Sequence, residues 1–533
     1  MNETYDRKLL SGDEAVAQAA RDAGVALGAG YPGTPSTEIM EQFSALGGKA
    51  QWAPNEKVAF EVALGAAFGG ARALVTMKHV GLNVAADPLF TAAYTGVTGG
   101  LVVVCADDPG LASSQNEQDN RHYARAAGVP MLEPSDSQES YDFTLKAFAL
   151  SEQWHTPVLL RMTTRVCHSN TLVRTAPPTA PAPAAHYEKD VATRVMIPSN
   201  ARSAHKRLAE KLQTLAVWND KSELTITVPG TSDWGVITSG ISYMHVREAA
   251  PEASVLKLGM TWPLPLDALQ KFVSSLKRCL VIEEGDPFLS DALRAQGLAV
   301  DVQPRAFHFG ELNVERVRRL VRRDETPEPT PVGGRPPQLC PGCPHRVSFE
   351  TLRDLNCIVS GDIGCYTLGV LPPFSAMDTC VCMGASVGVG LGLRHVLPPE
   401  MARRVVSVIG DSTFMHSGLT GLLDMVYNPP ATGHVVLILD NGTTAMTGLQ
   451  DHPGTGRRLN LAPARAVAPE KLAEAMGISN VHVIDPVADR PGFVALLTES
   501  LKRDALTVIV ARRACLLVVA RNKKIAARQG GAA

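Results

Sequence analysis

The sequence predicts a multidomain α/β protein built on parallel sheets. Short, continuously apolar stretches such as 101–105 and 405–409 alternate with helix-forming stretches along the chain, and strands of this kind lie in parallel sheets covered on both faces. The 533 residues suffice for roughly three domains. Gly (45) and Pro (37) are frequent while aromatic residues make up 5%, which favours many tight strand-to-helix turns over an aromatic-rich sandwich.

Charge and hydropathy exclude several classes of protein. The 51 Lys and Arg residues nearly balance the 53 Asp and Glu residues, leaving a net charge of -2, whereas a nucleic-acid binder or a disordered acidic chain would need a strong imbalance. The first residues carry acidic side chains without the apolar core of a secretory signal. Since no apolar stretch reaches the roughly 18 residues of a membrane span, we expect a cytoplasmic protein that binds no nucleic acid.

Two Pro-rich stretches divide the chain into three α/β segments. The first segment covers 1–175, where Ser11 caps an Ala-rich helix, and it ends at a linker over 176–185 because Pro favours extended backbone. A smaller α/β segment covers 186–321, and a second linker covers 322–337. The third segment covers 338–520, and 521–533 is expected to be a flexible tail. Strands are expected at 73–76, 101–105, 157–161, 224–228, 234–237, 255–258, 279–282, 358–360, 405–409, 435–439 and 506–510.

The most informative motif follows two of these strands. One ends in Gly410-Asp411-Ser412, and the next precedes Asn441, 30 residues after Asp411; both would end at the sheet edge where ligands of open α/β sheets bind. Gly410 would let the backbone approach an anion, and the following helix would offer free N–H groups to phosphate. Oxygens from Asp411, Asn441, the Thr443 carbonyl and a diphosphate would nearly fill an octahedral Mg²⁺ shell. Gly-Asp-Ser alone would more often be an ordinary turn, but the paired motifs predict a diphosphate-and-metal site.

This pair of motifs resembles the signature of thiamine diphosphate enzymes, Gly-Asp-Gly followed at the same spacing by Asn, with Ser412 replacing the third Gly. The resemblance implies that the cofactor spans two α/β domains and that a Glu from the other domain protonates its aminopyrimidine ring. Glu56, which opens a helix of small residues in the first segment, is the candidate, and its position at the helix start favours a side chain that reaches out of the fold. Glu61, on the same helix, is the rival and would more often be structural.

Further motifs, in order and over nearly the whole length, are similar to the indolepyruvate ferredoxin oxidoreductase family of thiamine-dependent 2-oxoacid oxidoreductases. They are Gly30-Tyr-Pro-Gly-Thr-Pro-Ser-Thr-Glu, Asn55-Glu-Lys-Val-Ala-Phe-Glu, Met77-Lys-His-Val-Gly-Leu-Asn, Leu339-Cys-Pro-Gly-Cys-Pro-His-Arg and Gly361-Asp-Ile-Gly-Cys-Tyr. The resemblance implies a pyrimidine-binding domain over 1–175, a domain like the transketolase C-terminal domain over 186–321, and a diphosphate-binding domain over 338–520.

The resemblance also implies roles for individual residues. Glu56 would be the aminopyrimidine acid, and Thr34 would lie near the thiazolium ring and the substrate. Lys78 and His79 follow the 73–76 strand, where a cation could pair with the substrate carboxylate and His79 is a catalytic candidate, although such a pair usually lies in a solvated loop. Asp411, Asn441 and Thr443 would bind Mg²⁺. The cofactor-binding set is Glu56, Gly410, Asp411, Ser412, Asn441, Thr443, Gly364 and Gly384.

Four of the ten cysteines are candidate metal ligands. Cys340 and Cys343 form a C-x₂-C pair in a Pro/Gly turn, and Cys365 follows; a lone C-x₂-C pair would as readily bind zinc or be redox-active. The resemblance implies a proximal [4Fe-4S] cluster ligated by Cys340, Cys343, Cys365 and Cys515. The other six have apolar or helical neighbours or no second pair nearby, and we expect them in the core: Cys105, Cys167, Cys279, Cys357, Cys380 and Cys382.

The function implied is that of a subunit of a 2-oxoacid oxidoreductase acting on an aryl pyruvate such as indolepyruvate or phenylpyruvate, with acyl-CoA as product, coenzyme A as co-substrate and electrons leaving through iron–sulfur carriers. The family's alpha subunit normally continues into a two-cluster ferredoxin module, and no such cysteine run follows Cys515. We therefore expect a separate ferredoxin or ferredoxin-like acceptor, a small gamma/beta-type subunit, and two copies of this chain within a hetero-oligomer. The alternatives are a non-oxidative thiamine-dependent decarboxylase or lyase, and a catalytically silent scaffold.

Overall fold

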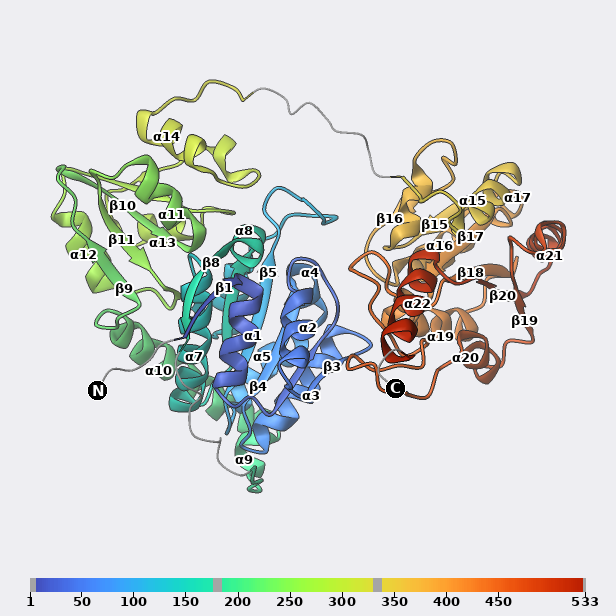
Figure 1. Cartoon of the computed structure of the whole chain (residues 1–533), viewed down its shortest axis with the longest axis horizontal. Helices are drawn as coiled ribbons and strands as arrows, with labels where there is room; N and C mark the ends of the chain where they lie inside the picture. Colours follow the sequence, from blue (N-terminus) through green and yellow to red (C-terminus); the bar gives the residue numbers. More distant parts are fainter. Residues whose placement is uncertain (1–5, 176–184, 329–337, 531–533) are drawn as a thin grey trace. The chain divides into compact units, whose positions relative to one another are not determined.

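The computed structural model describes residues 6–175, 185–328 and 338–530, and it divides into two compact units, residues 1–329 and 330–533 (Figure 1). The boundary between the units falls within the expected second linker, 322–337. Most of the first expected linker and the end of the second lie outside the described residues. The first two predicted segments thus belong to one compact unit, and the third forms the other.

Unit 1 is built around a seven-stranded sheet that is parallel except at one edge. Its strands, in spatial order, are β12 (Met260–Trp262), β6 (Met131–Leu132), β7 (Val158–Thr163), β5 (Leu101–Asp107), β4 (Ala73–Lys78), β2 (Leu27–Gly30) and β3 (Ala50–Trp52). Its helices are α1 (Gly12–Asp22), α2 (Thr37–Ala45), α3 (Glu56–Phe68), α4 (His79–Val84), α5 (Ala86–Thr95), α6 (Arg121–Ala127), α7 (Ser137–Trp154), α8 (Thr164–His168), α9 (Val191–Arg194) and α10 (Pro198–Asn219).

Both faces of this sheet are buried, as the continuously apolar strands predict. Val102 and Val103 on β5 point to opposite faces, and both are fully buried. Val103 belongs to a core that it shares with Ala63 of α3 and Ala92 of α5, while α7 packs against β5 and β7. Polar side chains can therefore reach solvent or a ligand mainly at the ends of the strands, where the connecting loops lie.

A second sheet of unit 1 has five strands in the order β14 (Asp301–Val302), β13 (Arg278–Ile282), β10 (Trp234–Ser239), β11 (Ser254–Leu258) and β9 (Thr225–Val228), with only β9 antiparallel. Its helices are α11 (Gly240–Ala249), α12 (Leu266–Ser274), α13 (Phe288–Ala295), the 3₁₀ helix η1 (Arg305–His308) and α14 (Val314–Arg322). The chain then returns to the first sheet: β12, which follows β11, pairs antiparallel with β6.

Buried ion pairs lie at the carboxyl ends of the strands of unit 1, and one of them connects its two sheets. Within the seven-stranded sheet, Arg161 on β7 donates to Asp107 at 2.6 Å and to Glu133 at 3.0 Å. Arg121, at the start of α6, donates at 2.8 Å to Glu283, which follows β13, and both of these side chains are fully buried. Charges removed from water in this way must be paired, and here the pairing links the carboxyl ends of strands from both sheets.

A two-stranded antiparallel ribbon, β1 (Asp6–Ser11) with β8 (Asn170–Thr175), accompanies the main sheet of unit 1. Ser11 then caps α1 as predicted, and it forms a capping box with Glu14: the Glu14 N–H donates to Ser11 Oγ at 3.2 Å, and the Ser11 N–H donates to the Glu14 carboxylate at 2.9 Å. The ribbon thereby fixes where α1 begins relative to the end of α8.

Unit 2 contains a fully parallel six-stranded sheet in the order β16 (Thr379–Cys380), β15 (Ile358–Gly361), β17 (Val405–Gly410), β18 (His434–Asp440), β20 (Leu506–Arg512) and β19 (Asn480–Ile484). Its helices are α15 (His345–Asp354), η2 (Cys365–Val370), α16 (Ala385–Val396), α17 (Pro399–Ala402), α18 (Asp411–Thr413), the π-helical η3 (Phe414–Gly418), α19 (Leu419–Tyr427), α20 (Pro469–Ala475), α21 (Arg490–Lys502) and α22 (Leu516–Gly530). Alternate residues of β18 enter two separate cores, which again shows a sheet covered on both faces.

Every strand expected from the sequence is present, with boundaries shifted by a few residues at most. The tail was predicted wrongly in part, because residues 521–530 form the last turns of α22. In the part of the chain that the structure describes, no helix has both the length and the apolar character needed to cross a bilayer.

Candidate active site

The two paired motifs of unit 2 lie side by side. β17 and β18 are parallel neighbours with Gly410 opposite Leu439, so Asp411 and Asn441 follow adjacent strand ends. Two contacts tie the motifs together: the Gly442 N–H donates to Asp411 Oδ2 at 2.8 Å, and the Ser412 and Thr444 hydroxyls are 2.7 Å apart. The two loops therefore lie together at the carboxyl edge of the sheet, as the sequence predicted.

The donor atoms in this cluster are suited to a hard cation. Asp411, Asn441 and Thr443 are 3%, 7% and 2% exposed, and they offer a carboxylate, an amide oxygen and a main-chain carbonyl. Mg²⁺ prefers oxygen ligands and is commonly bound through one or two carboxylates together with substrate phosphates. The three residues predicted as Mg²⁺ ligands thus fit the ion by donor chemistry.

Two histidines that the sequence analysis did not single out support these residues. His452 Nε2 is 3.2 Å from Asp411 Oδ2. Burial acts to lower the pKa of His452, but the carboxylates of Asp411, Asp440 and Asp451 together outweigh burial, and the pKa is raised. The Asn441 amide donates to His345 Nε2 at 3.1 Å, and burial lowers the pKa of His345 to about 4, which keeps it neutral. Only the fold reveals these contacts, because neither histidine has a diagnostic spacing to its partner.

Gly410 has a packing reason to be glycine that the sequence did not indicate. A Cβ on Gly410 would lie 2.6 Å from Cε1 of Tyr366, so the buried aromatic ring leaves no room for a side chain there. Gly364 lies against the same ring. Gly384 precedes α16 with a φ of +87° and donates its N–H to Asp362 Oδ1 at 2.9 Å. The glycines predicted to bind the cofactor thus surround Tyr366 and Asp362.

Asp362 is a residue of this region that sequence reasoning missed. It is fully buried and accepts main-chain N–H groups from Ile363 at 2.8 Å, Gly384 at 2.9 Å and Ser386 at 2.9 Å. These bonds fasten the loop after β15 to the start of α16. A sequence signal was present, since Asp362 lies in the Gly361-Asp-Ile-Gly-Cys-Tyr motif, but nothing in that motif indicates which N–H groups it accepts.

The four cysteines predicted as cluster ligands gather in unit 2. Burial, followed by the nearby thiols of Cys343, Cys515 and Cys340, raises the pKa of Cys365 to about 11. The Cys340–Cys343 turn is closed by the Cys343 N–H, which donates to the Cys340 carbonyl at 3.0 Å. The Cys515 N–H donates to the carbonyl of Asn441 at 2.9 Å. The Cys365 thiol is therefore near enough to the other three thiols to be influenced by them, and the main chain of Cys515 contacts the Asn441 loop.

The remaining cysteines follow the predicted core placement only in part. Cys105, Cys167 and Cys279 are buried, and Cys357 is half-buried against a core of unit 2. The prediction was wrong for Cys380 and Cys382, which are exposed. The lack of a second cysteine pair nearby, on which this prediction rested, says nothing about burial, and β16, which contains Cys380, is a two-residue strand at the edge of its sheet.

Glu56 lies at the carboxyl edge of the unit 1 sheet, where it begins α3 behind the N-cap residue Asn55, whose side chain accepts from the Val58 N–H at 3.0 Å. The sequence predicted a Glu56 side chain that reaches out of the fold, but this side chain is only 5% exposed. It lies against Gly81 of α4, where a Cβ on Gly81 would be 2.6 Å from Glu56 Oε1. The rival Glu61 is exposed and forms a surface ion pair with Lys57.

Thr34 and the Lys78–His79 pair lie near each other at the same edge. The loop after β2 approaches β4, since a Cβ on Gly33 would be 2.9 Å from Cβ of Lys78. The Lys78 ammonium donates to the Ser113 carbonyl at 2.8 Å, and burial lowers the pKa of Lys78 to about 8. His79 is fully buried, and its Nε2 is 3.1 Å from the Asn116 carbonyl. The location of Lys78 and His79 at this edge agrees with the prediction. His79 is covered by the 108–120 loop and does not lie in a solvent-exposed loop.

Two family models match the chain. Residues 18–219 match "Pyruvate flavodoxin/ferredoxin oxidoreductase, thiamine diP-bdg", and residues 362–511 match "Thiamine pyrophosphate enzyme, C-terminal TPP binding domain". The first match contains Thr34, Glu56 and Lys78, and the second contains Asp411 and Asn441. The candidate residues of unit 1 and those of unit 2 therefore fall in two regions that each match a family model named for thiamine diphosphate binding.

Curated relatives match nearly the whole chain. The indolepyruvate oxidoreductase subunit IorA of Archaeoglobus fulgidus is 40% identical over 97% of this chain and 88% of its own length. The subunit of the same name from Methanothermobacter thermautotrophicus is 39% identical over 96% of this chain and 87% of its own length. Among solved structures, the 2-oxoglutarate:ferredoxin oxidoreductase from Magnetococcus marinus has a TM-score of 0.52 at 18% identity over 60% of this chain and 65% of that chain, which supports the fold.

Proposed function

The chain belongs to the indolepyruvate oxidoreductase IorA family of thiamine diphosphate-dependent 2-oxoacid oxidoreductases, and from this premise we propose that it decarboxylates an aryl pyruvate oxidatively and passes the electrons to iron–sulfur carriers. In the proposed reaction a 2-oxo acid and coenzyme A give an acyl-CoA, CO₂, one proton and two electrons. Coenzyme A and succinyl-CoA are named with the 2-oxoglutarate:ferredoxin oxidoreductase of the same fold. The aromatic specificity rests on the indolepyruvate activity named for the relatives.

When bound, thiamine diphosphate supplies the electron sink for the carbon that loses CO₂. We assign Glu56 as the acid that exchanges a proton with the aminopyrimidine ring. Support comes from its position at the carboxyl edge of the unit 1 sheet and from its burial against Gly81, since a carboxylate shielded from water interacts more strongly with a ring nitrogen. Thr34 and the ammonium of Lys78, from the neighbouring loops, are assigned to bind the substrate, with Lys78 pairing with its carboxylate.

In unit 2, Asp411, Asn441 and the Thr443 carbonyl are assigned to bind Mg²⁺, which would hold the diphosphate. His452 is a positioning residue for Asp411, because their contact orients the carboxylate. Neutral His345 does the same for Asn441: by accepting from the amide nitrogen, it leaves the amide oxygen as the atom that faces a cation.

One observation carries the oxidative assignment over the non-oxidative one. Four cysteines gather beside the metal-binding loops, and the main chain of Cys515 is hydrogen-bonded to that of Asn441. A decarboxylase or lyase that only protonates its intermediate has no use for a redox centre at this place. We assign a [4Fe-4S] cluster to Cys340, Cys343, Cys365 and Cys515 because four thiolates on such spacings are its usual ligands.

The proposed reaction needs partners. The relatives are named as subunits, and we propose a smaller oxidoreductase subunit, a ferredoxin or ferredoxin-like acceptor that takes electrons from the cluster, and a second copy of this chain in the same complex.

Iron and acid-labile sulfide analysis of anaerobically purified protein tests the oxidative assignment. We expect about four of each per chain and a brown protein, and we expect Cys515→Ser to lose most of both. Cys382→Ser is the matched control, because Cys382 is exposed and outside the four-cysteine group, and it should keep the full content. A colourless wild-type protein that still decarboxylates 2-oxo acids would contradict the assignment and favour the non-oxidative alternative.

Glu56→Gln separates a catalytic subunit from a scaffold. Gln has nearly the same volume but cannot exchange the proton, so turnover should fall by about 10²–10⁴-fold, while thiamine diphosphate binding, measured by equilibrium dialysis, should remain. Glu61→Gln on the same helix removes only a surface ion pair with Lys57, and its activity should stay near wild type. Unchanged turnover in Glu56→Gln would remove Glu56 from the mechanism.

A further inference from the structure

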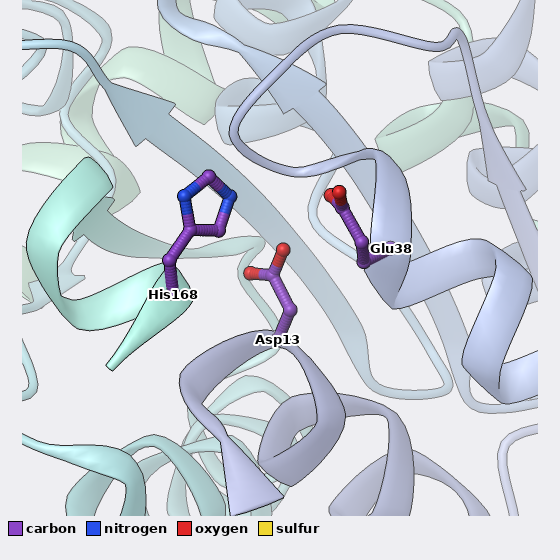
Figure 2. A group of neighbouring side chains, drawn as sticks. All are labelled: Asp13, Glu38 and His168. Carbon is purple, nitrogen blue, oxygen red and sulfur yellow. The ribbon is translucent and has the colours of Figure 1, made fainter. Parts of the chain in front are cut away.

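Three side chains to which no role has been assigned so far converge in unit 1. Asp13 comes from the first turn of α1, Glu38 from the first turn of α2, and His168 from the end of α8 (Figure 2). One donor atom from each, two carboxylate oxygens and an imidazole nitrogen, lie within 4.8 Å of one another. Figure 2 shows the Asp13 carboxylate directed toward the space between the other two side chains.

The backbone explains why these residues meet. In the β1–β8 ribbon Ser11 pairs with Asn170. Asp13, two residues after Ser11, and His168, two residues before Asn170, are therefore brought together. Gly12 allows the close approach, because a Cβ there would collide with the carbonyl oxygen of Val166 in α8. Since α1 also packs against α2, Glu38 completes the group.

Asp13 is buried without the partners that a buried carboxylate requires. Its exposed fraction is 0%. Within the described residues neither carboxylate oxygen has a hydrogen-bond partner at good distance and angle, and the neighbours that come near enough to act on it as weaker partners are the Cys167 thiol and the Glu38 carboxylate. It is not needed as a helix cap, because Ser11 and Glu14 already form the capping box of α1. A buried carboxylate of this kind is costly unless it is neutral or faces a cation.

Among the described residues, the groups that act most strongly on Asp13 include no ammonium or guanidinium group. Burial raises the pKa of Asp13 well above its usual value; the Cys167 thiol opposes this rise as a hydrogen-bond partner, and the Glu38 and Glu14 carboxylates add to it. Two carboxylates and an imidazole therefore surround one point, which is a donor set that suits a bound cation.

We propose that Asp13, Glu38 and His168 bind a divalent cation of the Mn²⁺ and Zn²⁺ class. Carboxylate oxygen and imidazole nitrogen together suit these ions, and the positive charge would stabilise the buried Asp13 carboxylate. Glu38 and His168 are exposed, so the ion reaches the site from solvent and keeps open positions for water. Bound there, it joins α1, α2 and α8, and α2 begins three residues after Thr34, which links the site mechanically to the loop assigned to the substrate.

The test counts Mn²⁺ sites on the full chain by electron paramagnetic resonance of the unbound ion. The protein is first saturated with thiamine diphosphate and Mg²⁺, so that the diphosphate site does not contribute, and Mn²⁺ is chosen because it binds thiolates poorly. We expect one more Mn²⁺ site per chain in the wild type than in Asp13→Asn, which keeps the volume of the side chain but removes its charge.

Two further variants and a control complete the test. Glu38→Gln and His168→Gln alter exposed side chains that can be changed without disturbing the core, and each should lose the same site if Asp13→Asn fails to fold. Glu41→Gln, an exposed acid on α2, should keep it. Equal Mn²⁺ stoichiometry in the wild type, Glu38→Gln and His168→Gln would overturn the proposal and leave Asp13 as a neutral buried acid. This outcome is independent of the proposed activity, because no turnover is measured.

Discussion

Replacing Arg161 with Met tests whether the buried ion pairs hold unit 1 together. The guanidinium contacts Asp107 at 2.6 Å and Glu133 at 3.0 Å, and all three side chains are at most 3% exposed. Met has a similar volume but no charge, so both carboxylates would lose their cation in a region that water does not reach. Breaking a buried pair in this way costs about 3–5 kcal/mol.

The loss of unfolding free energy in Arg161→Met should increase with pH. Burial already raises the pKa of Asp107 to about 7 although Arg161 opposes it, so without Arg161 the pKa rises further and the native state retains a proton that the unfolded state releases. A group whose pKa is raised on folding costs more stability as the pH rises above its unfolded pKa, by up to about 1.4 kcal/mol per pH unit. The stability deficit of Arg161→Met should therefore be larger at pH 8 than at pH 5.

Urea unfolding followed by tryptophan fluorescence measures this cost in unit 1 alone, since all five Trp residues lie within residues 1–329. Arg165→Met is the control: Arg165 makes two hydrogen bonds of 2.7 Å to Glu311, but its side chain is 49% exposed, so its loss should cost about 0–1 kcal/mol. Equal deficits in the two variants, or a deficit in Arg161→Met that shrinks between pH 5 and pH 8, would refute the reasoning.

Three further predictions concern the candidate site. Gly410→Ala places a Cβ 2.6 Å from the Tyr366 ring and should destabilise unit 2 by about 1–3 kcal/mol, measured by far-UV circular dichroism during urea unfolding; an unchanged midpoint would contradict the close packing. Asp362→Ala leaves the Gly384 and Ser386 N–H groups without their acceptor and should cost about 2–6 kcal/mol in the same assay, whereas a loss below 1 kcal/mol would show that water replaces the carboxylate. Because burial lowers the pKa of Lys78 to about 8, its ammonium is lost above that pH, so KM for the 2-oxo acid should rise between pH 8 and pH 9 in the wild type and stay high and flat in Lys78→Met; parallel KM profiles would exclude the pairing with the substrate carboxylate.

The strands and the paired motifs were predictable because their causes are local. The apolar runs 405–409 and 435–439 predict strands that are buried on both faces, and β17 and β18 are buried in this way. Because these strands are parallel neighbours, Asp411 and Asn441 lie at the same edge of the sheet. The C-x₂-C turn at Cys340 and Cys343 is likewise local, whereas Cys365 and Cys515 could be grouped with it only through the family resemblance.

Other features depend on packing between distant segments, which spacing does not encode. The contact of His452 with Asp411 spans 41 residues, and the ring that packs against Gly410 belongs to Tyr366, which comes from another motif. Glu56 was expected to reach outward because it begins a helix, but the position of α4 decides its burial. The Asp13 group depends on the register of a ribbon whose two strands lie more than 150 residues apart, so no sequence window contains it.

The antiparallel strand β12 bears on how this chain can be divided. It comes from the middle of the sequence, yet it closes the β6 edge of the first sheet. A fragment ending at residue 175 would expose that edge as a template for intermolecular pairing, and it would also strip Arg121 of Glu283. The first two α/β segments are therefore one folding unit despite the Pro-rich stretch between them. Recombination, expression trials and domain swaps within this family should place their junctions after residue 329 and not at the first linker.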